Sequence, residues 1–108
     1  MKLSEIRDVL LTVGVPVFHY FGKTKEDKYI VWAEDNESGS LKADDEVIEQ
    51  EIQGTIDYFT REEFDENVLK IQQALNSANI PFRLNSVQHE DDTNFVHFEW
   101  TFEVIFDG

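Results

Sequence analysis

Two segments of the chain carry apolar residues at the spacing of an α-helix. Residues 3–13 place theirs three and four positions apart, and Gly14 followed by Pro16 ends the pattern. A second pattern follows Thr60 and Glu63, which have the spacing of a capping box, and runs to about Asn76. The apolar positions are Ile6, Val9, Leu10 and Val13 in the first segment, and Phe64, Val68, Ile71, Leu75 and Ala78 in the second. We expect two amphipathic helices.

Alternating apolar and polar residues predict strands in the rest of the chain. One of these patterns, from Val47 to Thr60, covers 14 residues, whereas a usual strand has about five or six. We therefore expect a bend or bulge in it near Gly54. The other candidates are Val15–Phe21, Tyr29–Ala33, Phe82–Gln88 and Phe95–Phe106. The last two are separated by an acidic turn at Asp91–Asn94, so a hairpin is expected there.

The segment from Glu34 to Asp45 is the most polar part of the chain. It contains turn-forming residues and no periodicity, which predicts an exposed loop. With this loop the element order is helix, two strands, a long strand, helix and two strands. Runs of adjacent strands favour an α+β fold, an antiparallel β-sheet with two main helices packed on one face. The 108 residues fit a single domain, and no linker divides them.

The net charge of the chain restricts the classes of function that are possible. The chain has 9 Lys and Arg against 23 Asp and Glu, a net charge of −14. Such a surface is unsuited to gripping nucleic acid or an anionic membrane, because both need clustered basic side chains. The absence of cysteine excludes disulfides, thiolate metal sites and cysteine nucleophiles. We expect no signal peptide, since charge begins at Lys2, and no membrane span, since the longest uncharged run is only residues 9–22.

The sequence contains only weak signals for a catalytic or metal-binding site. The loop from Glu34 has the spacing of a calcium loop, but it lacks flanking helices and begins with Glu instead of Asp. The three histidines, His19, His89 and His97, lie on different predicted strands without ligand-like spacing. Chance carboxylate pairs are unavoidable among 23 acids, and no nucleophile or phosphate-binding motif is present. We expect no enzyme activity, no metal and no cofactor.

Several stretches carry a family resemblance over about Ile6 to Ile105. They are Val15–Phe18; Tyr29–Asp35 with the acidic loop and Ala43–Asp45; Gln53–Thr60 leading into the helix with Leu69–Leu75; and His97–Val104. In these stretches the chain resembles the small tail terminator proteins of long-tailed bacteriophages and prophages, also called tail completion or head–tail joining proteins. The resemblance lies in fold and register features and includes no catalytic signature.

The resemblance implies a structural virion protein that caps the tail tube. Such proteins form a ring, usually a hexamer, that stops tube growth and docks onto the head connector protein. They are made in the bacterial host cytoplasm and end in the virion tail. DNA would pass through the ring without specific binding, because negative charge repels phosphate. The residues expected at a subunit or tube interface, or lining the lumen, are Glu34, Asp35, Asn36, Glu37, Asp44, Asp45, Glu49 and Glu51.

The same charge permits an alternative. A small acidic protein-binding module, such as an inhibitor that mimics nucleic acid against a basic partner, would also be non-enzymatic and strongly negative. The two interpretations differ in self-association. A ring-forming protein contacts copies of itself, whereas an inhibitor binds as a monomer.

Overall fold

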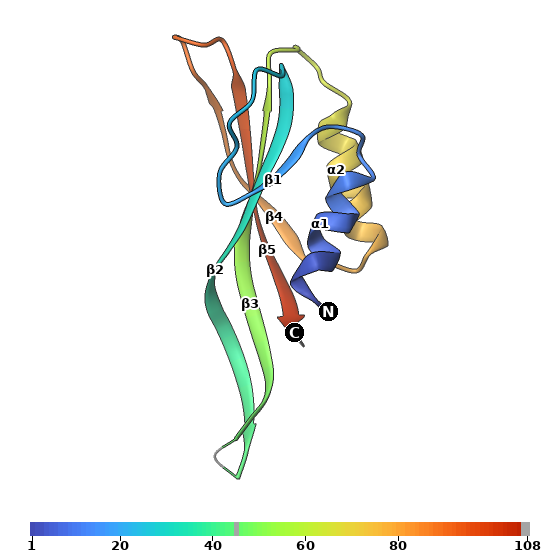
Figure 1. Ribbon diagram of the computed structural model, residues 1–108, viewed down its shortest axis with the longest axis vertical. Coiled ribbons are helices and arrows are strands. Elements are labelled where there is room, and N and C mark those ends of the chain that lie inside the picture. Colours follow the sequence, from blue (N-terminus) through green and yellow to red (C-terminus); the bar gives the residue numbers. More distant parts are fainter. Residues whose placement is uncertain (45, 107–108) are drawn as a thin grey trace.

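The computed structural model describes residues 1–44 and 46–106. Its elements are α1 (Leu3–Leu11), β1 (Val17–His19), β2 (Lys28–Ala43), β3 (Glu46–Thr60), α2 (Asn67–Ser77), β4 (Phe82–His89) and β5 (Val96–Phe106). The strands form one sheet in the order β1-β2-β3-β5-β4 (Figure 1). Neighbouring strands are antiparallel except β1 and β2, which are parallel. The α+β fold expected from the sequence is confirmed.

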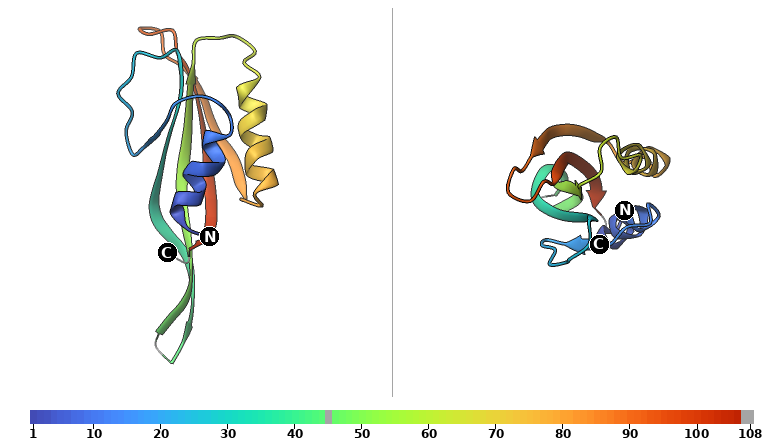
Figure 2. Two further views of the ribbon diagram at one scale, coloured as in Figure 1. Left: turned by 45° about the vertical axis from the view of Figure 1, so that its right-hand side comes forward. Right: turned by 90° about the horizontal axis from the view of Figure 1, so that it is seen from above.

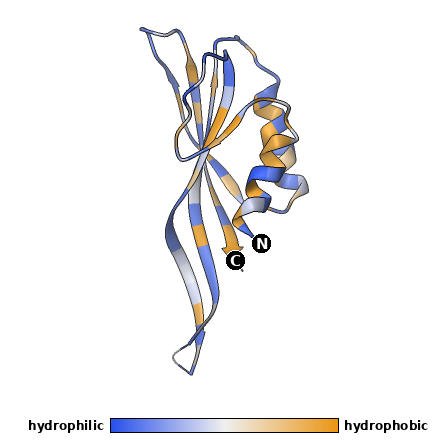
Figure 3. Ribbon diagram, viewed as in Figure 1, coloured by the Kyte–Doolittle hydropathy of each residue, from blue (hydrophilic) through white to orange (hydrophobic). Residues whose placement is uncertain are grey.

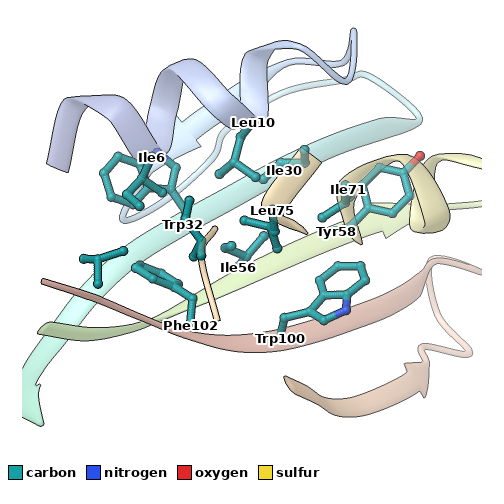
Figure 4. Packing of buried hydrophobic residues seen from close by; sticks show 12 residues of the cluster. Ile6, Leu10, Ile30, Trp32, Ile56, Tyr58, Ile71, Leu75, Trp100 and Phe102 are labelled. Carbon is teal, nitrogen blue, oxygen red and sulfur yellow. The ribbon is translucent and has the colours of Figure 1, made fainter. Parts of the chain in front are cut away.

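Both helices cover the same face of the sheet (Figure 2). The core lies between these layers because the apolar stripes of the helices and the inward positions of the central strands meet there. Ile6, Leu10, Ile71 and Leu75 come from the helices, and Ile30, Trp32, Ile56, Tyr58, Trp100 and Phe102 come from the sheet (Figure 4). The indole N–H of Trp100 donates to Gln72 Oε1 at 3.0 Å, so α2 is also tied to β5 by a polar contact.

The polar segment expected to be a loop is a strand instead. β2 runs for 16 residues, through Glu34 to Ala43, and pairs with the 15 residues of β3. The prediction was wrong because backbone pairing with a long partner satisfies the N–H and C=O groups of turn-type residues. Three register irregularities in the β2–β3 ladder accommodate them. The pair forms a long ribbon below the body in Figure 1, and the molecule extends 53 × 25 × 22 Å.

Gly54 lies where β3 passes between its two neighbours. It is opposite Glu34 on β2 and Phe102 on β5. A Cβ at Gly54 would collide with the Ala33 carbonyl oxygen and lie 2.6 Å from Phe102 Cζ, so only glycine fits. The irregularity expected near Gly54 is found on the facing strand, where the register shifts between Glu34 and Asn36.

Two element boundaries also differ from expectation. The second helix begins at Asn67, not directly after Thr60, because Thr60 Oγ1 donates to Asp65 and accepts from the Glu62 N–H in a separate turn. Phe64 therefore precedes the helix and is exposed. The first strand is limited to Val17–His19, since the chain leaves the sheet at Tyr20, which has a positive φ of 73°.

Replacing Gly54 by Ala should lower the free energy of unfolding by about 1–3 kcal/mol, because overpacked cores cost this much. Urea unfolding followed by circular dichroism measures the change. Gly39→Ala on the same ribbon is the matched control, since its Cβ would meet only the end of the flexible Glu51 side chain, at 3.0 Å. Equal stabilities of the two variants would contradict the close approach at Gly54.

Candidate interaction surfaces

The β2–β3 ribbon continues beyond the strands that support it. β1 ends opposite Trp32, and β5 ends with Phe106 opposite Gln50. Beyond Trp32 the outer edge of β2 has no strand partner among the described residues. Beyond Gln50 the described part of the chain places only two strands in the ribbon. A two-stranded ribbon is marginally stable alone, and its unpaired edges can accept another chain.

Glu34 anchors the base of this ribbon. Its carboxylate accepts a hydrogen bond from the Tyr20 hydroxyl and lies 2.9 Å from His19 Nε2. His19 in turn stacks on Trp32 with ring centroids 4.0 Å apart. Burial alone would raise the pKa of the Glu34 carboxyl, but the bonds from Tyr20 and His19 outweigh it and lower the pKa. The Glu34 carboxylate is therefore hydrogen-bonded within its own chain, at the base of the ribbon.

The other expected interface residues are spread along the ribbon. Asp35 lies at the register shift, and Asn36 pairs with Gln53. Glu37 Oε2 accepts a hydrogen bond from Gln50 Nε2 at 2.7 Å. Asp44 is in the turn with a positive φ of 52°, and Asp45 lies outside the described residues.

Glu49 and Glu51 line one side of the ribbon together. Glu51 pairs with Gly39, and Glu49 pairs with Leu41, which is 54% exposed. These four residues and Ser40 border a shallow hollow of about 370 Å³. The hollow is bordered by two carboxylates and by the exposed Leu41 side chain, and Gly39 has no side chain to fill it. Most of the ribbon is hydrophilic in Figure 3, so its contacts would be largely polar.

The calcium-loop spacing does not form a binding loop. Glu34, Asn36, Ser38 and Ser40 are strand residues, so their side chains are distributed along an extended backbone. Within residues 1–44 and 46–106, no group of three or more His, Asp or Glu side chains could hold a metal ion. In the same part of the chain, neither helix has the length and apolar character needed to cross a bilayer.

A second surface, which the sequence did not predict, is an aromatic cluster on the sheet face opposite the helices. Tyr29 stacks on Phe59 at a centroid distance of 4.7 Å, and Phe59 stacks on His97 at 4.3 Å. Phe95 meets the edges of this stack, and the Arg61 guanidinium lies 4.1 Å above its ring. The loop after β1 passes beside the cluster and leaves a hollow of about 300 Å³.

His97 is held in this cluster by a carboxylate on the neighbouring strand. Its Nε2 lies 2.7 Å from Asp57 Oδ1, and both side chains are about one-fifth exposed. The hydrogen bond to Asp57 raises the pKa of His97 above 6.5, and this effect outweighs the opposing effect of burial. The ion pair between His97 and Asp57 therefore stabilises the sheet face opposite the helices when His97 is protonated.

No protein family and no characterised protein matches the sequence.

His97→Gln should reduce stability in a pH-dependent way. Because the folded pKa is raised, the charged pair contributes fully below the ordinary value of 6.5 and is lost as pH rises through the folded pKa. We expect the variant to be less stable by roughly 1.5 kcal/mol near pH 5.5, the lower end of the net value of a hydrogen bond to a charged group. The difference should shrink toward about pH 9, as the pH rises through the folded pKa of His97. Urea unfolding at both pH values measures it, with exposed His89→Gln as the control; a difference independent of pH would contradict the ion pair.

Proposed function

We propose that this chain is a structural virion protein that caps a phage tail tube as a ring and joins the tail to the head connector. The observation that carries the proposal is the β2–β3 ribbon, which extends past both β1 and β5. A ribbon of this length has too little support within one copy, so a contact with a second chain is the natural source of its stability. Neighbouring subunits, or the tube below a ring, would supply that contact.

The ribbon is protected against indiscriminate pairing. Its sides carry charged residues such as Glu37, Glu49 and Glu51, and charged side chains block edge-to-edge aggregation between strands. Such an edge is suited to a partner that is already positioned, as the next subunit of a closed ring is. This combination favours assembly on a template over free aggregation.

The negative charge has a role in the same proposal. A channel lined by carboxylates repels phosphate, so DNA passes without binding. Glu49 and Glu51 share one side of the ribbon and are candidates for the lumen surface. The resemblance to tail terminator proteins and the charge of −14 support this assignment together.

The first test reverses charge on the ribbon. A variant with Glu37, Glu49 and Glu51 changed to Lys is mixed with tubes of the tail-tube protein encoded in the same genome. Tube length is then measured by electron microscopy, and DNA retention by filter binding. We expect capping to weaken roughly 100-fold, because unfavourable interface charges cost several kcal/mol, or the ring to retain DNA.

The control variant changes Glu26, Asp91 and Asp92 to Lys, at the end of the molecule away from the ribbon. It alters the net charge by the same amount, so it should cap tubes and release DNA like the unchanged protein. Unaltered capping and DNA passage in the ribbon variant would overturn the assignment of the ribbon. A genome without tail-tube or connector genes would overturn the function itself.

The second test separates the ring from the acidic inhibitor. Copies that each carry a charge of −14 repel one another, so self-association should strengthen with added salt. Raising the ionic strength from about 0.15 M to about 1 M shortens the Debye length from about 8 Å to about 3 Å. Sedimentation velocity across this range measures the oligomer. A protein that stays monomeric, while binding a basic partner less tightly as salt rises, would be the inhibitor.

A further inference from the structure

Phe64 is the most exposed large apolar residue of the described chain. Its relative exposure is 94%, and it lies in the turn between β3 and α2, at the end of the body away from the ribbon (Figure 1). Its backbone has a positive φ of 57°, a conformation that bulky residues rarely adopt. An apolar ring that points into solvent from a strained backbone lowers the stability of a single copy, and burial within that copy does not compensate for this cost. Strain of this kind is concentrated at functional positions.

The turn that carries Phe64 is rigidly supported. The neighbouring Asp65 is 8% exposed and accepts hydrogen bonds from the Tyr58 hydroxyl at 2.6 Å and the Thr60 hydroxyl at 2.7 Å. The Asn67 N–H donates to its other oxygen at 2.8 Å. Burial alone would raise the pKa of the Asp65 carboxyl, but these bonds outweigh it and lower the pKa. The backbone that carries Phe64 is therefore held in a fixed position, which reduces the entropy lost on binding.

A groove on the helix layer has the size and chemistry to receive an aromatic ring. It lies between α1 and α2, which run side by side in both Figure 1 and Figure 2. Its volume is about 460 Å³, and a cavity of about 150 Å³ already holds benzene. The apolar lining comes from Val9, Val13, Ala74 and Ala78, and Lys70 and Gln73 are polar members of its border. The groove exists because these helix positions carry small side chains.

We propose that Phe64 of one copy inserts into the α1–α2 groove of the next copy, as the repeating contact of the assembly. The inference rests on the proposed ring function, because it defines how neighbouring subunits meet. The inserted residue and the groove lie on different parts of the molecule, so the contact is head-to-tail. Heterologous contacts of this type generate closed rings when the rotation between copies closes.

Charge beside the two surfaces is complementary. Phe64 follows two acids, Glu62 and Glu63, whereas the groove is bordered by Lys70. Lys70 now pairs with Glu66 on its own helix at 3.4 Å, and both side chains are at least half exposed. An approaching Glu63 would therefore meet a basic side chain on an otherwise acidic protein. This pairing sets the orientation of the inserted ring more than its affinity.

A single inserted ring is an anchor and does not form a whole interface. One Phe buries about 150–250 Å², whereas a stable interface buries about 1,200–2,000 Å² in total. Ring closure gives every copy two such contacts, so the closed assembly is much stronger than an isolated pair. The contact is therefore weak between two free copies and effective on a template.

Two variants test the contact from its two sides. Phe64→Gly removes the inserted ring, and Gln73→Trp places a large side chain over the groove at an exposed helix position. Each variant alone should weaken self-association by about 30-fold or more, the level of an interface hot spot. An equimolar mixture should regain one intact contact, between Phe64 of the Gln73→Trp copy and the free groove of the Phe64→Gly copy. At the high concentrations where the unchanged protein self-associates, the mixture should form heterodimers that do not grow, as measured by sedimentation velocity and native mass spectrometry.

Stability and a second exposed Phe provide the controls. Phe64→Gly should leave the melting temperature unchanged or raise it by up to about 4 °C, because glycine accepts a positive φ. Phe21→Ala, at a residue 79% exposed beside the aromatic cluster, should leave association unchanged. Ser77→Trp, also bordering the groove, replaces Gln73→Trp if that variant misfolds.

The following outcomes would contradict the proposed contact. Unchanged association of the Phe64→Gly protein would overturn it, as would a mixture that fails to form dimers or a wild-type protein monomeric at every concentration. The tube assay distinguishes failure of this contact from failure of the function. A Phe64→Gly protein that still caps tubes would refute the contact and keep the capping role. A wild-type protein that does not cap tubes would refute the role, whatever the two variants do in solution.

Discussion

The close approach of three strands at Gly54 is the constraint on which the rest of the structure depends. β3 is the central strand, and the absence of a side chain at Gly54 lets β2 and Phe102 close on it from two sides. Most of the core lies on one side of this point, between the sheet and the two helices. On the other side β5 accompanies β3 as far as Gln50, and the β2–β3 ribbon extends beyond it. A single glycine thus sets the close packing of the three central strands, from which the ribbon continues.

Two polar clusters fix the body on either side of the core. Near the base of the ribbon, Glu34 binds Tyr20 and lies within 2.9 Å of His19, so the chain leaving β1 is held against β2. At the far end, Asp65 accepts hydrogen bonds from the hydroxyls of Tyr58 and Thr60 and fixes the turn that leads into α2. Both carboxylates are partly or wholly buried and hydrogen-bonded, which is how a buried charge becomes tolerable. Rigid ends are what an assembly subunit needs if its contacts are to recur with one geometry.

The sequence predicted the parts of the fold that follow from periodicity. Alternation predicted the two strands that carry the buried Tyr58 and Trp100, and helical spacing identified Ile71. Periodicity could not identify residues 34–43 as a strand, because turn-type residues there depend on pairing with β3 rather than on their own propensity. Among the predicted acids, Glu34 is hydrogen-bonded to Tyr20 at the base of the ribbon, whereas Glu37, Glu49 and Glu51 lie farther along it. The aromatic cluster was missed because its members come from three separate segments of the chain.

The central claim is that the ribbon completes its structure only against another chain. Hydrogen exchange of the backbone amides tests this claim directly. It is followed by mass spectrometry on the free protein and on the protein assembled at the ends of tail tubes. The account predicts fast exchange across residues 36–42 in the free protein, strong protection of the same residues in the assembly, and protection of residues 54–58 in both states. Equal exchange of residues 36–42 in the two states would contradict it.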